Sequence, residues 1–134
     1  MNAASKPHLL VVDDEPAVLI TYQLILEQKG YRVTPASSSQ EAYQTLRSEK
    51  VDLLVCDLSL EHSESGFEVI ESAKRENPLL PSLLITGYAT ETAIQKAEDS
   101  GVPVLFKPID IQELFETIAS LLRNTREQPQ TRGA

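Results

Sequence analysis

The chain has 134 residues, enough for one domain of ordinary size with a single hydrophobic core. Hydrophobic residues make up 41% of it and charged residues 24%, which is typical of folded globular proteins and excludes disorder of the whole chain. The net charge of -8 argues against direct nucleic-acid binding, because neutralising phosphates requires clustered Lys and Arg.

Strand and helix patterns alternate along the chain. In order they are strand 8–12, helix 17–29, strand 31–36, helix 38–50, strand 51–58, helix 66–77, strand 81–86, helix 91–100, strand 102–106 and helix 110–123. Pro16 suits a first helical turn, and Gly30 marks the end of that helix. Ser38 with Glu41 fits a capping box, and Thr90 is a cap for a later helix.

This alternation predicts an α/β protein with a parallel sheet covered by helices on both faces. We favour a flavodoxin-like three-layer α/β/α sandwich whose five-stranded sheet has the order 2-1-3-4-5. The predicted domain spans residues 7–123. Residues 124–134 are polar without apolar periodicity, and we expect them to form a disordered tail.

Two further features bear on the cellular setting. Residues 1–7 contain no apolar stretch resembling a signal peptide, and no apolar run approaches the ~20 residues that cross a membrane. We therefore expect a cytoplasmic protein without membrane insertion. Cys56, the single cysteine, cannot form an internal disulfide and is predicted to be a small buried hydrophobe.

Polar residues end four of the predicted strands. In parallel sheets, ligands bind outside the carboxyl ends of the strands. The residues expected at this edge are Asp13, Asp14, Asp57, Thr86 and Lys107. Three neighbouring carboxylates repel one another, and a Mg2+ ion, which prefers oxygen ligands, would relieve that repulsion. An Asp carboxylate can attack a phosphoryl group, so the set predicts a phosphoryl-acceptor site.

Four motifs in this order resemble the receiver domains of two-component response regulators. They are LLVVDDEP at residues 9–16, LLVCDL at 53–58, LITGY at 84–88 and FKP at 106–108. The resemblance covers residues 7–122, and its strength lies in the order of the motifs, since each is common alone. It implies a stand-alone module regulated by a sensor histidine kinase or phosphotransfer protein. The downstream protein target is unknown, and a homodimer through the last two helices is left open.

The resemblance also implies a role for each site residue. Asp57 would be the phospho-acceptor. Asp14 would bind Mg2+ (or Mn2+) directly and Asp13 mainly through water, with the backbone carbonyl of Ser59 completing the protein ligands. Thr86 and Lys107 would hold the phosphoryl oxygens.

The sequence departs from the family pattern at three places. The loop 60–65 lacks the usual Pro, and Gly66 comes one residue late. Val104 replaces the usual aromatic residue three positions before Lys107, and Tyr88 lies close enough to Thr86 to influence water access. We therefore expect displacement of the segment after Thr86 and of helix 91–100, not a swinging aromatic ring, to carry the signal.

Three other functions compete with this interpretation. A scaffold domain that keeps the fold but is not phosphorylated remains an alternative: the intact five-residue site counts against it, and the unusual loop and Val104 count for it. A phosphatase or phosphotransferase would need a carboxylate two residues after its nucleophile, where this chain has Ser59. A flavin carrier would need a phosphate-binding loop after the first strand, which is missing. His8 and His62 are interpreted as surface residues.

Overall fold

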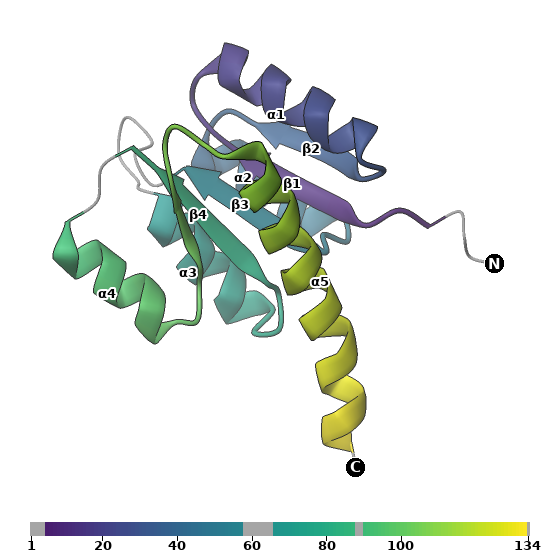
Figure 1. Ribbon diagram of the computed structural model, residues 1–134. Helices are drawn as coiled ribbons and strands as arrows, with labels where there is room; N and C mark the ends of the chain where they lie inside the picture. The colour runs from purple at the N-terminus through teal and green to yellow at the C-terminus, as the bar shows by residue number, and fades with distance from the viewer. Residues whose placement is uncertain (1–4, 58–65, 88–89, 134) are drawn as a thin grey trace.

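The computed structural model describes residues 5–57, 66–87 and 90–133. Five parallel strands form one sheet in the order β2-β1-β3-β4-β5, which confirms the predicted topology (Figure 1). The strands are β1 (His8–Val12), β2 (Arg32–Ala36), β3 (Leu53–Asp57), β4 (Ser82–Thr86) and β5 (Val104–Phe106). The helices are α1 (Pro16–Gln28), α2 (Ser39–Ser48), α3 (Gly66–Glu76), α4 (Glu91–Asp99) and α5 (Ile111–Gly133).

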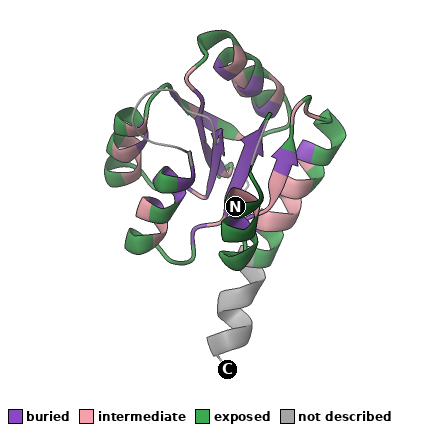
Figure 2. Ribbon diagram, turned by 90° about the vertical axis from the view of Figure 1, so that its left-hand side faces the viewer, coloured by how far each residue is buried: buried purple, intermediate pink, exposed green. Residues whose placement is uncertain are grey.

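The sheet separates two hydrophobic cores. One lies under α2, α3 and α4 and includes Leu10, Leu54 and Cys56, so the predicted burial of that cysteine is confirmed. The other lies under α1 and α5 and includes Leu9 and Leu53. Neighbouring residues of a strand alternate between the two cores because successive side chains point to opposite faces. Every described residue of β1, β3 and β4 is buried, whereas the helices expose their outer faces (Figure 2).

Polar caps fix where the helices begin. The hydroxyl of Ser38 accepts a hydrogen bond from the backbone N–H of Glu41 at 3.1 Å, as the capping box predicts. The carboxylate of Glu41, however, accepts from the N–H of Ser37 at 2.7 Å and not from that of Ser38. Thr90 caps α4 through the N–H of Ala93 at 3.1 Å. Local sequence signals thus set the starts of α2 and α4, which follow β2 and β4 at the carboxyl edge of the sheet.

The last helix is longer than predicted. It continues to Gly133 and leaves the body of the domain, so the helix end expected near Arg123 is wrong, and the residues expected to be disordered are helical up to Gly133 (Figure 1). Extending an existing helix costs far less than nucleating one, and Arg and Gln, which make up five of the twelve residues after Leu122, favour extension. The domain boundary at residue 123 stays a prediction.

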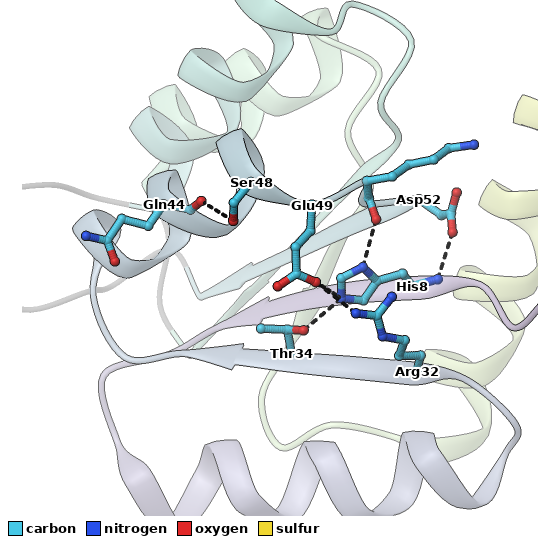
Figure 3. A network of polar contacts seen from close by, with 8 residues as sticks. His8, Arg32, Thr34, Gln44, Ser48, Glu49 and Asp52 are labelled. Atoms are coloured by element: carbon cyan, nitrogen blue, oxygen red, sulfur yellow. Dashed lines mark hydrogen bonds and ion pairs between the residues drawn. The ribbon is translucent and has the colours of Figure 1, made fainter.

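His8 is buried, with 2% of its surface exposed, so its interpretation as a surface residue is wrong. Its ring lies 2.7 Å from the carbonyl oxygen of Lys50 through Nδ1 and 2.7 Å from the hydroxyl of Thr34 through Nε2 (Figure 3). Its backbone N–H donates to Asp52 at 2.8 Å. β1 lies between β2 and β3, and this central position encloses even its first residue. His62, the other histidine, lies outside the described residues.

Candidate functional site

The predicted site residues gather at the carboxyl edge of the sheet because the strand register aligns the strand ends. Val12 of β1 pairs with Cys56 of β3, which places Asp13 and Asp57 in adjoining positions one step farther along. The N–H of Lys107 donates to the carbonyl oxygen of Thr86 at 2.8 Å and extends the pairing of β4 with β5 to this edge. Residues separated by up to 94 positions, from Asp13 to Lys107, thus share one edge.

Asp57 and Lys107 form an ion pair at the centre of this edge. The ammonium Nζ of Lys107 lies 2.8 Å from Oδ2 of Asp57, and only 6% of the aspartate is exposed. Burial alone would lower the pKa of Lys107, but the hydrogen bond and the charge of Asp57 outweigh it and raise the pKa above its usual range. Lys107 is therefore a permanent positive charge directed at the carboxylate, and charge-assisted bonds of this kind are strong.

Asp13 lies beside this pair and is 1% exposed. Its Oδ1 accepts a hydrogen bond from the N–H of Glu15 at 2.9 Å, whereas its buried Oδ2 has no hydrogen-bond partner within the described residues. Burial is the main cause that raises the pKa of Asp13 to about 6. The N–H of Glu15 opposes that rise, the nearby Asp57 carboxylate adds to it, and the charge of Lys107 opposes it. The surroundings of Asp13 therefore stabilise the charged form of its carboxylate only in part.

These features fit a small divalent cation. Mg2+ is commonly bound through one or two carboxylates and keeps several waters, so Asp13 and Asp57 can supply the protein ligands that it needs. The buried, unpartnered Oδ2 of Asp13 is the atom that would gain most from a cation. The described residues do not form a ready-made cluster of three or more His, Cys, Asp or Glu ligands, and Ser59 lies outside the part of the chain that is described.

Two other predicted positions are partly placed. Thr86 ends β4 and is fully buried at the same edge. Val104 lies in β5, half-buried against the core under α4, where it supplies packing volume but no hydroxyl or aromatic ring. Asp14 is half-buried directly after Asp13. The loop 60–65 and Tyr88 lie outside the described residues, so what was predicted for them stays a prediction.

Tyr22 is a neighbour of the site that the sequence did not reveal. It is 7% exposed and lines a groove of about 460 Å³ between α1 and the segment after β5, together with Lys107 and Pro108. Burial raises the pKa of its phenol; the charge of Lys107 opposes that rise, and those of Asp13 and Asp57 add to it. Its helical spacing with Val18 predicts only that it faces the core. Its closeness to Lys107 depends on how α1 packs beside the end of β5.

A model of the family described as the response regulator receiver domain matches residues 9–119 of the chain. The chain belongs to this family. It therefore is a receiver domain of the kind found in two-component systems, and the predicted family and fold class are both confirmed. No helix in the described part of the receiver domain is long and apolar enough to cross a membrane.

Named relatives give the same result. The receiver domain is 32% identical over 126 residues to the transcriptional regulatory protein ZraR of Klebsiella oxytoca, with 92% of this chain and 28% of that protein covered. It is 34% identical over 118 residues to the probable transcriptional regulatory protein TcrX of Mycobacterium tuberculosis, with 87% and 50% covered. The chain thus spans half or less of these two relatives, and their other segments say nothing about it.

Solved structures also match. A response regulator receiver domain protein (CheY-like) from Methanospirillum hungatei JF-1 superposes with a TM-score of 0.87 at 28% identity, covering 92% of this chain and 99% of that one. The signal receiver domain of an HD domain-containing protein from Pseudomonas fluorescens Pf-5 gives 0.86 at 27% identity, covering 92% and 100%. Nearly the whole chain therefore has the receiver fold.

Proposed function

We propose that this receiver domain accepts a phosphoryl group on Asp57 from a sensor histidine kinase or phosphotransfer protein, with Mg2+ or Mn2+ bound, and that phosphorylation switches its protein contacts. The observation that carries the proposal is the buried carboxylate of Asp57, which Lys107 holds at 2.8 Å beside the second buried carboxylate, Asp13. A nucleophile, a fixed positive charge and a candidate cation ligand thus lie at one edge of the sheet.

In the proposed reaction, a carboxylate oxygen of Asp57 attacks the phosphorus atom of the donor. A new P–O bond forms while the bond from phosphorus to the donor nitrogen breaks, and the electron pair of that bond leaves with the donor. The product is an acyl phosphate. Lys107 then has a phosphoryl oxygen within reach as well as its present carboxylate partner, and the hydroxyl of Thr86 can donate to another.

A cation would be held by the carboxylates of Asp13, Asp14 and Asp57, with the carbonyl of Ser59. When bound, it would neutralise charge on the transferring oxygens. The buried Oδ2 of Asp13 supports this assignment, because an unpartnered carboxylate oxygen is costly without a positive neighbour.

Receiver domains generally do not turn over an external substrate, and we extend that to this chain. An enzyme that uses Asp57 as nucleophile would need a general acid nearby to protonate a leaving group. The position two residues later is Ser59, which cannot supply that proton well.

We further propose that the signal leaves through α4, β5 and α5. Thr86 moving toward the phosphoryl group would displace the segment that follows it. Ala97 is the one fully buried residue of α4, whereas Ala93 and Ile94 are half-buried. A helix with so few buried anchors has low local stability, which suits an element that rearranges.

Labelling with acetyl phosphate tests the acceptor. Intact-mass spectrometry in the presence of Mg2+ should show one added phosphoryl group on the wild type and none on Asp57→Asn. Asp52→Asn is the matched control, because Asp52 is also an aspartate of this stretch but binds His8 at the opposite edge of the sheet. Equal labelling of Asp57→Asn would refute the assignment. An unlabelled wild type would favour the phosphorylation-independent interaction domain, which Val104 at the switch position also favours.

Melting curves test the metal. Mg2+ or Mn2+ should raise the melting temperature of the unphosphorylated protein, because a ligand that binds only the folded state stabilises it. Asp14→Asn should weaken binding more than Asp13→Asn if Asp14 is the direct ligand. An undiminished effect of the cation on a variant lacking both carboxylates would rule the site out.

A further inference from the structure

The side chain of Lys107 is long, and its position over Asp57 requires walls. One wall is Gly87: a Cβ atom built on this glycine would lie 3.8 Å from Cδ and 3.9 Å from Cβ of Lys107, at ordinary van der Waals distance. A methyl group would therefore fit between the backbone of Gly87 and the lysine stem, so this position borders Lys107 without requiring glycine.

Lys107 also borders the groove of about 460 Å³ between α1 and the segment after β5. This groove is the alternative space for the ammonium, since the lysine side chain is 33% exposed and is not fixed by burial alone. Val18, Tyr22 and Ile25 line the groove from α1. Tyr22 is the largest of these side chains, and it lines the same groove as Lys107.

Tyr22 belongs to the hydrophobic core under α1 and α5. It is 7% exposed, so a hydrophobic side chain would satisfy the core. Its hydroxyl makes no hydrogen bond within the part of the chain that the structure describes and is not among the buried polar atoms left without a partner, so it is open to solvent. What distinguishes the position is its place on the groove wall that faces Lys107.

We propose that Tyr22 is a positioning residue for Lys107: its ring narrows the groove and thereby keeps the ammonium over Asp57 instead of turned away from it. The role rests on the proposed phosphoryl transfer. A free lysine side chain visits many rotamers, and a catalytic group already confined to its working geometry loses less conformational entropy when the reaction occurs. The ring, not the hydroxyl, is the functional part.

Two substitutions of Tyr22 separate these contributions. Tyr22→Leu keeps an apolar side chain but widens the groove, and it should slow labelling by acetyl phosphate about three- to tenfold. Tyr22→Phe keeps the ring and should label within about twofold of the wild-type rate. Affinity for Mg2+ should stay the same in both variants, since neither removes a carboxylate. Leu26→Val is the control: Leu26 lies one turn farther along α1, is buried and does not line the groove.

A second measurement follows the lysine itself. NMR relaxation of the Lys107 side-chain methylene groups should report greater mobility in Tyr22→Leu than in the wild type, and unchanged mobility in Tyr22→Phe and Leu26→Val. The proposal is overturned if Lys107 is equally ordered in Tyr22→Leu, or if Leu26→Val slows labelling as much. If the wild type is not labelled at all, the proposed function fails, and the mobility of Lys107 still decides the role of Tyr22.

Discussion

Replacing His8 by Phe isolates the contribution of one buried polar network. The substitution keeps a ring of similar size and leaves the backbone N–H that donates to Asp52. It removes both ring nitrogens. A carbonyl oxygen only accepts, so the Nδ1 that faces Lys50 must carry a hydrogen, and in the neutral ring Nε2 then accepts from the hydroxyl of Thr34.

The expected loss follows from the groups left behind. In His8→Phe, the carbonyl of Lys50 and the hydroxyl of Thr34 both lose a partner at 2.7 Å. An unsatisfied buried polar group costs about 1–3 kcal/mol, and the half-buried Thr34 can recover part of this from water. We expect the free energy of unfolding to fall by about 2–4 kcal/mol. The total free energy of unfolding of a single domain is about 5–15 kcal/mol, so this loss would be a large part of it.

Urea unfolding followed by circular dichroism measures this loss, and Thr34→Val provides the matched partner. Because the double variant replaces both the ring and the hydroxyl with apolar groups, it should lose less than the sum of the two single variants. Labelling of Asp57 should not change, since the five residues of β1 separate the two edges by roughly 16 Å. The reasoning is refuted if His8→Phe is as stable as the wild type. It is also refuted if the double variant loses as much unfolding free energy as the two single variants together.

Two further predictions concern the carboxyl edge. Without divalent cations, the free energy of unfolding should fall as pH rises from about 4 to about 6, because burial raises the pKa of Asp13 from 3.8 to about 6 and the folded state holds that proton more tightly. Asp13→Asn should flatten this slope in urea titrations, and an unchanged slope would contradict the assignment. Hydrogen exchange with beryllofluoride, a phosphoryl mimic, should change at Gly87, α4 and α5; changes confined to residues 60–65 would refute the proposed route.

Much of the fold follows from patterns that are local in the sequence. The alternation of apolar runs with capped helical segments determined the element types, and right-handed crossovers reduced the topology to few choices. The meeting of these residues was predictable for the same reason: Asp13, Asp57 and Lys107 each end or follow a strand, and parallel strands end at one edge. One rule about strand ends therefore predicted where these side chains meet, and the chemistry assigned to them stays a proposal.

The missed features depend on contacts between distant segments. The partners of the His8 ring lie 26 and 42 residues away, so no spacing near His8 indicates that they meet. The groove that joins Tyr22 to Lys107 likewise depends on the packing of α1 beside the segment after β5. A helical pattern predicts that Tyr22 faces inward but not which side chain it will face. The extension of α5 beyond Arg123 was not predicted, because apolar periodicity indicates which helical residues pack against the core. A helical segment that packs against nothing leaves no such pattern in the sequence.

His8 and Asp13, at opposite edges of the sheet, differ in how their polar atoms are satisfied. At the amino edge both ring nitrogens of His8 have partners, whereas at the carboxyl edge Oδ2 of Asp13 is buried without one among the described residues. A cation should therefore recover stability at the carboxyl edge only, by an amount set by its concentration and affinity. We expect Mg2+ to stabilise the wild type and His8→Phe by the same amount, because distant sites contribute additively. Urea midpoints with and without Mg2+ test this, and a smaller effect of Mg2+ on His8→Phe would show that the two edges are coupled.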